Sequence, residues 1–125
     1  MAIEKILVVD DEEIISSYLQ RKLTKLGYTV YVAGDGERAL ELASAHIPDI
    51  ILLDVKLPKL TGVEVCKRLR ADDRTRDIFV LMLSAKAQAA EIEEGISAGA
   101  NKYLCKPISF PAILDEIRWC EAYPR

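Results

Sequence analysis

The sequence predicts an α/β fold in which one parallel sheet of five strands is covered by helices on both faces. Three observations support this prediction. Short apolar runs alternate with longer segments whose apolar residues recur every three or four positions. Turn residues and short polar connections separate these segments, and no repeat or linker interrupts the 125 residues. Several of the short runs are apolar throughout, which is typical of strands buried on both faces of a parallel sheet.

The first half of the chain predicts three strands and two helices. An apolar run at 6–9 is followed by an amphipathic helix that carries Ile14 and Tyr18 among its apolar positions and stops at Gly27. β-branched and aromatic residues predict the second strand at 28–32. A second helix is expected at 37–45. Pro48-Asp49 then breaks the chain before the third strand, at 50–53.

The second half continues the alternation. A loop at 55–62 leads into a third helix, and the fourth strand is expected at 78–83, where every residue is apolar. A helix at about 87–98 stops at Gly99; a short fifth strand at 103–105 precedes a last helix that ends near 123–124. The first, third and fourth strands are the most continuously apolar and should be central. This favours the flavodoxin-like (βα)5 three-layer sandwich, with strand order 2-1-3-4-5 and right-handed crossovers.

Composition restricts the classes of function. The length suits one domain with a substantial core. A net charge of −3 offers no basic surface for nucleic acid. No apolar run approaches the roughly 18–20 residues that span a membrane, and the N-terminus lacks a signal-peptide pattern, so we expect a cytoplasmic protein without membrane contact. Cys66, Cys105 and Cys120 form no CxxC pair and are expected to be buried or half-buried; His46 is expected to be solvated.

Polar residues follow four of the five strands, at the ends that a parallel sheet brings to one edge. Asp10 and Asp11 follow the first strand, Asp54 the third, Ser84 the fourth and Lys106 the fifth. Ligands of open α/β sheets bind at this edge. Three unpaired carboxylates would repel one another and raise at least one pKa, a problem that Mg²⁺ removes because it prefers oxygen ligands. A hydroxyl and an ammonium indicate in addition an anion with several oxygens, and a phosphoryl group on Asp54 suits them all.

Each of these residues also has a simpler interpretation. Asp10 or Asp11 alone is more often a helix N-cap, and Asp54 alone could cap a turn. Ser84 alone is more often a cap or strand-end residue, and Lys106 alone is most often solvated. Phosphoacceptance is favoured because it explains all of these strand ends together.

The sequence resembles the receiver domain of two-component response regulators, from Lys5 to about Trp119. The matching motifs, in order, are Val8-Val9-Asp10-Asp11-Glu12, Asp54 with Pro58 and Gly62 after it, Leu83-Ser84-Ala85, Gly99-Ala100, and Tyr103-Leu104-Cys105-Lys106-Pro107. The resemblance implies that residues 1–125 form one receiver (phosphoacceptor) domain of a phosphorelay. Such a domain is a signalling switch and not a general enzyme, since it catalyses only its own phosphorylation and dephosphorylation.

The resemblance also implies who donates the phosphate and what holds the metal. Asp54 would accept phosphate from a phosphohistidine on a sensor histidine kinase or a phosphotransfer protein. Asp11, Asp54 and the backbone carbonyl of Lys56 would ligate Mg²⁺ directly, or Mn²⁺ in its place. Asp10 would act mostly through water.

A switch is implied by the same resemblance. Ser84 and Lys106 would bind the phosphoryl group, Tyr103 would turn inward as Ser84 moves, and the peptide bond before Pro107 would be cis. The phosphoryl group adds about −1.5 to −2 charges at neutral pH. This change would alter the face made by the fourth helix, the fifth strand and the fifth helix, through which a downstream protein or output domain is addressed.

Three lysines bear on dimerisation and on the lifetime of the phosphoryl group. Lys102 stands where many relatives carry an acidic residue that forms salt bridges across a dimer, which argues against the dimer of the winged-helix DNA-binding subfamily. Lys56 and Lys86 lie two residues after Asp54 and Ser84, and we hypothesise that they tune the lifetime of the phosphoryl group. The alternative is that both are solvated surface lysines.

Three other functions compete with this interpretation. A flavodoxin-type flavin protein would need a Ser-, Thr- and Gly-rich loop where this chain has Asp10-Asp11-Glu12-Glu13. A phosphohydrolase of the haloacid-dehalogenase type usually has a second aspartate where this chain has Lys56. A receiver that binds partners without being phosphorylated is disfavoured because the acidic residues and Lys106 are all present. The chain is compatible with a stand-alone receiver and with one domain of a longer regulator.

Overall fold

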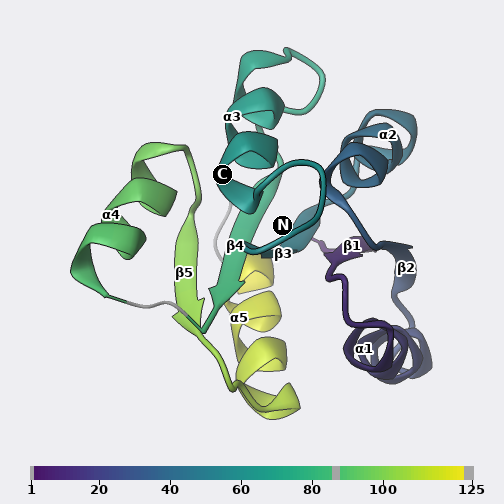
Figure 1. The fold of residues 1–125 in the computed structure, drawn as a ribbon. Helices are drawn as coiled ribbons and strands as arrows, with labels where there is room; N and C mark the ends of the chain where they lie inside the picture. Colours follow the sequence, from purple (N-terminus) through teal and green to yellow (C-terminus); the bar gives the residue numbers. More distant parts are fainter. Residues whose placement is uncertain (1, 86–87, 123–125) are drawn as a thin grey trace.

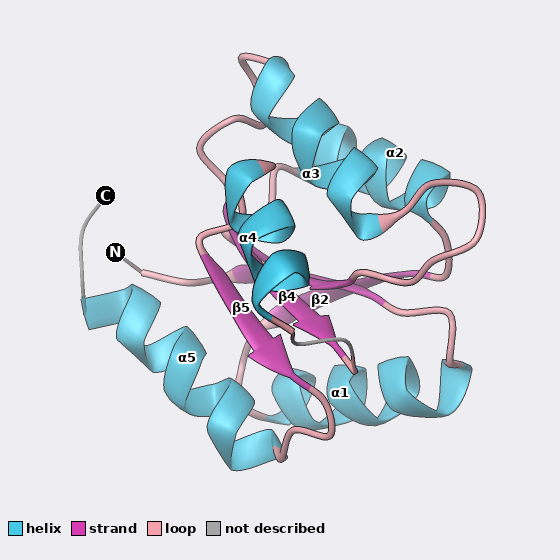
Figure 2. Cartoon of the chain, turned by 60° about the vertical axis from the view of Figure 1, so that its left-hand side comes forward, coloured by secondary structure: helices cyan, strands magenta, loops and turns pink. Residues whose placement is uncertain are grey.

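The computed structural model describes residues 2–85 and 88–122, which form a parallel sheet between two layers of helices (Figures 1 and 2). Helices α1 and α5 cover one face, and α2, α3 and α4 cover the other. The elements, in chain order, are β1 (Lys5–Val9), α1 (Glu13–Lys25), β2 (Thr29–Ala33), α2 (Gly36–His46), β3 (Ile50–Asp54), α3 (Gly62–Ala71), β4 (Phe79–Ser84), α4 (Ala89–Ser97), β5 (Lys102–Cys105) and α5 (Phe110–Ala122).

The strand order is β2-β1-β3-β4-β5, and every neighbouring pair is parallel. The predicted flavodoxin-like architecture is therefore confirmed. The predicted strand and helix limits differ from the observed ones by one or two residues. Residue 87, where the fourth helix was expected to begin, lies outside the described residues. No helix in the described ranges has the length and apolar character needed to cross a membrane.

The core consists of two apolar layers, one on each face of the sheet. Along β1, Leu7 and Val9 pack into the layer under α2 and α3, whereas Ile6 and Val8 pack into the layer under α1 and α5. The same alternation runs through β3 and β4, because successive side chains of a strand point to opposite faces. All five residues of β3 are buried, including the aspartate at its end. The strand that carries Asp54 is therefore held on both faces.

The ends of the helices follow from local chemistry. Gly27 has a φ of +99°, in the left-handed region that glycine tolerates, and it ends the α1 segment as predicted. Asp35 and Thr61 are the N-caps of α2 and α3, and their side chains accept hydrogen bonds from the backbone N–H groups of Arg38 and Glu64. These caps set where α2 and α3 begin beside the loops of the functional edge.

Two local expectations were wrong. Cys105 is exposed, because β5 is an edge strand and this residue lies at its end, whereas Cys66 and Cys120 are buried as expected. His46 is not simply solvated: its ring stacks on Tyr31, with 4.0 Å between the ring centroids. Not every apolar residue of α1 is buried: Ile14 is 87% exposed and Tyr18 is 42% exposed.

Candidate functional site

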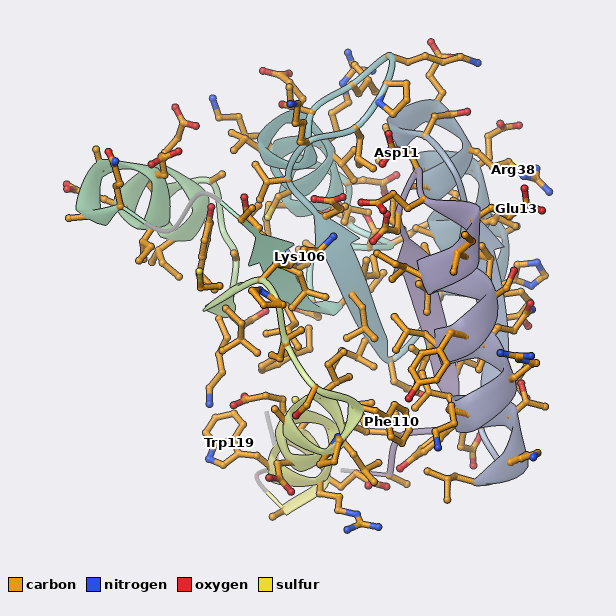
Figure 3. All side chains as sticks on the ribbon, turned by 60° about the horizontal axis from the view of Figure 1, so that its bottom comes forward. Asp11, Glu13, Arg38, Lys106, Phe110 and Trp119 are labelled. Carbon is orange, nitrogen blue, oxygen red and sulfur yellow. The ribbon has the colours of Figure 1, made fainter. Side chains whose placement is uncertain are left out.

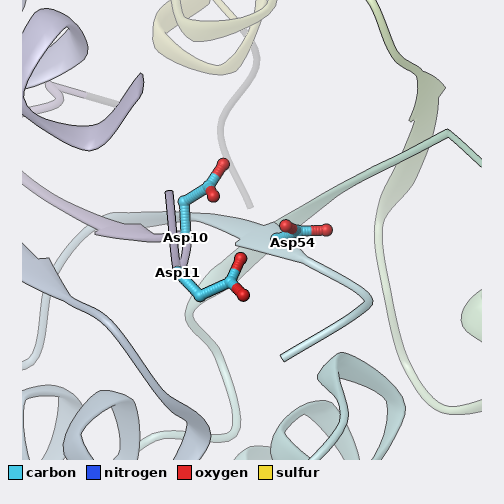
Figure 4. Close-up of side chains that lie close together, drawn as sticks. All are labelled: Asp10, Asp11 and Asp54. Carbon is cyan, nitrogen blue, oxygen red and sulfur yellow. The ribbon is translucent and has the colours of Figure 1, made fainter. Parts of the chain in front are cut away.

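The site lies at the edge where the carboxyl ends of the strands meet. Asp54 is the last residue of β3, and Asp10 follows β1 directly. Because Val9 is paired with Leu53, the two aspartates lie beside each other in neighbouring strands. Figure 4 shows the carboxylate of Asp11 next to those of Asp10 and Asp54. The sheet register therefore brings together the three carboxylates that the sequence predicted would meet.

Backbone hydrogen bonds fix these aspartates. The N–H of Asp10 donates to the carbonyl of Ala33 at 3.1 Å, and Oδ1 of Asp10 accepts from the N–H of Glu12 at 2.9 Å. Oδ1 of Asp54 accepts from the N–H of Lys56 at 3.3 Å. The N-cap of α1 is Glu12, so neither Asp10 nor Asp11 has that role.

Lys106 is the cation of the site. Its Nζ lies 3.0 Å from Oδ2 of Asp10 and 3.3 Å from Oδ2 of Asp54, and its side chain is 19% exposed. Figure 3 shows Lys106 beyond the end of β5 and Asp11 on the segment that leads into α1. The N–H of Lys106 donates to the carbonyl of Ser84 at 2.8 Å, which ties the end of β5 to the end of β4. The ammonium is thus shared by two buried carboxylates.

Burial and charge act in opposite directions on these groups. Burial raises the pKa of Asp54; the ammonium of Lys106 opposes this, the charge of Asp10 adds to it, and the pKa is raised overall. Burial alone would lower the pKa of Lys106, but the hydrogen bond to Asp10 and the charges of Asp54 and Asp10 outweigh it and raise that pKa. A raised carboxyl pKa was expected from repulsion between the aspartates. Repulsion contributes, but desolvation of Asp54 is the larger cause.

The acidic cluster fits a hard divalent cation. One carboxylate oxygen each from Asp10, Asp11 and Asp54 can be chosen so that all three lie within 4.8 Å of one another. Asp11 is exposed, whereas Asp10 and Asp54 are buried. Oxygen-only ligands with an open, solvated side suit Mg²⁺, which keeps several of its waters.

The other predicted residues lie around this cluster. Ser84 is 3% exposed and ends β4, next to Cys105 in the sheet. Tyr103 is half-buried and packs on the layer that contains Met82. The Lys106–Pro107 peptide bond is cis. Lys56 follows Asp54 and is exposed, and Lys86 lies outside the described residues.

A groove beside the acidic cluster was not predicted. It has a volume of about 500 Å³ and is lined by α1 and by the segment from the end of β5 into α5, with Asp10, Arg21 and Lys106 as its charged lining residues. Ile14, Tyr18 and Phe110 are among its apolar lining residues. The ring of Phe110 meets that of Tyr18 edge-on, with 6.3 Å between centroids. The available sequence signal was that Ile14 and Tyr18 are four residues apart and so share one face of α1.

Chemically, the site offers a carboxylate nucleophile surrounded by groups that can neutralise an anion. Asp54 sits at the end of a rigid strand, Lys106 supplies a positive charge and Ser84 supplies a hydroxyl group. The neighbouring acidic residues can hold a divalent cation. This combination suits phosphoryl transfer, in which catalysis is mainly positioning and charge neutralisation.

Comparison with known proteins gives the same result. Residues 6–118 match the model of the family described as the response regulator receiver domain. The alkaline phosphatase synthesis transcriptional regulatory protein PhoP of Bacillus subtilis is 50% identical over 107 residues, which is 85% of this chain and 43% of that protein. The DNA-binding dual master transcriptional regulator RpaA of Synechocystis is 43% identical, over 91% of this chain and 47% of its own length. The chain thus spans about half the length of the curated relatives it matches.

Solved structures of receiver proteins are also similar. The chemotaxis protein CheY4 of Vibrio cholerae superposes with a TM-score of 0.89 at 32% sequence identity, over 95% of this chain and 99% of that one. The receiver domain of the Francisella response regulator 1452 superposes with a TM-score of 0.87 at 30% identity, over 95% of this chain and 97% of that one.

Proposed function

The chain belongs to the response regulator receiver domain family and is a phosphoacceptor module of two-component signalling, and we propose that Asp54 is the residue that accepts the phosphoryl group. The observation that carries this assignment is the position of Asp54: it is the buried carboxylate at the end of the central strand, in contact with the ammonium of Lys106. Family membership disfavours the flavin-binding and phosphohydrolase alternatives. The remaining alternative is a receiver that binds partners without being phosphorylated.

In the proposed reaction, a carboxylate oxygen of Asp54 attacks the phosphorus of a phosphohistidine. The new O–P bond forms as the N–P bond breaks, and the imidazole of the donor leaves. Lys106 favours the ionised form of Asp54 before the transfer, since its ammonium opposes the rise in pKa that burial causes. After the transfer, the same ammonium can pair with a phosphoryl oxygen, and the hydroxyl of Ser84 can donate to another. The domain would catalyse only this transfer and the later loss of the phosphate.

The metal would be held by the oxygens beside Asp54. We assign direct ligation of Mg²⁺ to Asp11, Asp54 and the backbone carbonyl of Lys56, and contact through water to Asp10; Mn²⁺ would substitute. When bound, the ion supplies positive charge next to the phosphoryl oxygens. The chain's own part is to hold the oxygens at the strand ends, where Asp54 accepts from the N–H of Lys56 at 3.3 Å.

The groove beside the acidic cluster supports a docking site for the phosphodonor. A sensor histidine kinase or phosphotransfer protein must bring its phosphohistidine to Asp54. Asp10 and Lys106 line the groove, and α1 presents exposed apolar side chains to it, among them Ile14. An apolar helix face of the donor would bury these side chains.

The cytoplasmic location of the protein stays a prediction that rests on the family.

The output would pass through the face of α4, β5 and α5, with Tyr103 turning inward as Ser84 moves toward the phosphate. On this face Lys102 lies 2.8 Å from Oε2 of Glu116 and its Nζ is 4.4 Å from the ring centroid of Trp119. These contacts engage Lys102 within its own chain and support the proposal that the face does not form the winged-helix-subfamily dimer. With a net charge of −3, residues 1–125 are proposed to address a downstream protein or output domain and not nucleic acid itself.

Intact-mass spectrometry tests the assignment of Asp54. Wild type and Asp54→Ala are incubated with a small phosphodonor and Mg²⁺, with Asp49→Ala, at the residue just before β3, as a control. Wild type and the control should gain one phosphoryl group, and Asp54→Ala should not. An equal adduct on Asp54→Ala would remove the assignment, and no adduct on wild type would favour the receiver that only binds.

The lifetime of the phosphoryl group is a separate hypothesis. Lys56 and Lys86 are proposed to influence the water that attacks the phosphorus. Dephosphorylation rates of Lys56→Ala and Lys86→Ala are compared with that of wild type. Unchanged rates in both variants would show that they are ordinary surface lysines.

A further inference from the structure

The start of α2 packs against the loop that follows Asp54. This loop, residues 55–61, is called the β3–α3 loop below. Gly36 is the first residue of α2 and is buried. Its N–H points to the carbonyl of Pro58 at 3.4 Å, and a Cβ atom placed on it would lie 2.5 Å from Cβ of Leu60 and 2.7 Å from the carbonyl oxygen of Leu60. Leu60 of the β3–α3 loop thus occupies the space that a side chain at position 36 would need.

The β3–α3 loop is also fixed at its other end. A Cβ atom on Gly62 would lie 2.6 Å from the carbonyl oxygen of Asp54 and 2.7 Å from Cα of Val55. The N–H of Gly62 donates to the carbonyl of Val55 at 2.8 Å, which closes the loop. The loop therefore lies between two glycine contacts, one to α2 and one to the end of β3. A displacement at Leu60 cannot be absorbed at the Gly62 end of the loop, because Gly62 already lies in close contact with the backbone of Asp54 and Val55.

We propose that Gly36 is a positioning residue of the acidic site, acting through the β3–α3 loop on the backbone of Lys56. The proposal rests on the proposed function, in which the carbonyl of Lys56 is a ligand of Mg²⁺. Lys56 already donates its N–H to Asp54, so its backbone and the phosphoacceptor carboxylate move together. Because Gly36 has no side chain, the β3–α3 loop has the space it needs to keep the backbone of Lys56 in place.

The size of the loop displacement determines whether Mg²⁺ binding is affected. Restoring an ordinary contact of 3.4 Å between position 36 and Leu60 requires a shift of about 0.9 Å. Helix α2 is anchored by Ala39, Leu42 and Ala43, which are buried in the core, so the loop is the part that yields. Mg²⁺ requires nearly ideal octahedral geometry with ligand distances of about 2.0–2.1 Å. A shift approaching 1 Å in the loop is large by that standard.

The experiment compares Gly36→Ala with Gly34→Ala. Gly34 lies two residues earlier and is exposed, and a Cβ atom there would meet nothing within 4 Å. Isothermal titration calorimetry gives the dissociation constant for Mg²⁺, and urea denaturation gives the stability. Gly36→Ala should bind Mg²⁺ roughly tenfold more weakly, the lower end of the range for residues that position metal ligands. Gly34→Ala should bind as wild type does.

The Mg²⁺ dependence of the phosphorylation rate separates a positioning role of Gly36 from a purely structural one. In phosphorylation by a small phosphodonor, Gly36→Ala should need a higher Mg²⁺ concentration for half-maximal rate, yet approach the wild-type rate at saturating Mg²⁺. Wild-type Mg²⁺ affinity in folded Gly36→Ala, or equal weakening in Gly34→Ala, would overturn the proposal. Failure of wild type to take up phosphate would instead count against the function of Asp54.

If Gly36→Ala does not fold, the double variant Gly36→Ala/Leu60→Gly replaces it. Removing Cβ of Leu60 removes the nearest clashing atom, and the glycine lets the backbone at position 60 adjust so that its carbonyl oxygen can move away from position 36. The double variant should recover folding, as seen by circular dichroism, and bind Mg²⁺ about as well as Leu60→Gly alone. A double variant that folds but binds Mg²⁺ no better than the Asp11→Ala variant would contradict the proposal, as would one that remains unfolded while Leu60→Gly folds.

Discussion

Replacing Lys106 with methionine would leave two buried carboxylates without their shared cation. Nζ lies 3.0 Å from Asp10 and 3.3 Å from Asp54, whose side chains are 5% and 10% exposed. Removing one partner of a buried ion pair typically costs about 3–5 kcal/mol. Because the lysine side chain is itself 19% exposed, water already screens part of the interaction. We therefore expect the free energy of unfolding to fall by roughly 2–3 kcal/mol at pH 7 without Mg²⁺.

The loss should depend on pH in a defined direction. The carboxylates hold the pKa of Lys106 above its ordinary value. A lysine whose pKa is higher in the folded state stabilises the fold fully below its unfolded pKa, and this contribution is lost only as pH rises through the folded value. The variant should thus be destabilised at neutral pH. The difference from wild type should shrink in acid, as Asp54, whose pKa is raised by burial, becomes protonated and no longer needs a cation.

Urea denaturation of Lys106→Met, wild type and Lys59→Met measures the effect. Lys59 lies near the same edge, but it is 55% exposed and its ion pairs with Asp35 and Glu37 are 3.7 and 3.9 Å long. Exposed pairs often contribute nothing measurable, so Lys59→Met should match wild type. Added Mg²⁺ should restore part of the stability lost in Lys106→Met. Equal stability of the two variants, or no effect of Mg²⁺, would refute the reasoning.

Three further changes have expected outcomes. Asp54→Asn should be more stable than wild type at neutral pH, because burial raises the pKa of Asp54 and its charge therefore opposes folding above that pKa. The gain should disappear in acid in a pH series of urea denaturation. Arg70→Ala should lower the free energy of unfolding by about 2–4 kcal/mol, measured by thermal unfolding. The reason is that Arg70 makes four hydrogen bonds, including those to the carbonyls of Gly99 and Ile78. The control Arg68→Ala should change the stability little. Thr61→Ala should lower the free energy of unfolding by about 1 kcal/mol in the same measurement, because it removes the N-cap of α3.

The fold and the edge that carries the site were predictable because they depend on patterns that recur along the chain. Four of the five residues of β3 are apolar, and this pattern identified a strand buried on both faces. Once β1 and β3 were placed as neighbours, parallel topology required Asp10 and Asp54 to meet. Lys106 could be assigned to the same edge for the same reason.

Features that depend on individual side-chain positions could not be predicted. The stacking of His46 on Tyr31 joins α2 to β2 and leaves no periodic signal in the sequence. The close approach of Gly36 to Leu60 links residues 24 positions apart through backbone atoms, and a lone glycine before a helix does not indicate it. The exposure of Ile14 could not be derived from periodicity, since the helical pattern assigns apolar residues to the inner face.

The central claim is that Asp54 carries the phosphoryl group, and chemical trapping tests it most directly. Borohydride reduction converts an aspartyl phosphate into homoserine, and peptide mass spectrometry then locates the modified residue. After treatment with a small phosphodonor and Mg²⁺, homoserine should be found at position 54 and not at positions 10 or 11. Homoserine at Asp10 or Asp11, with position 54 unmodified, would contradict the account.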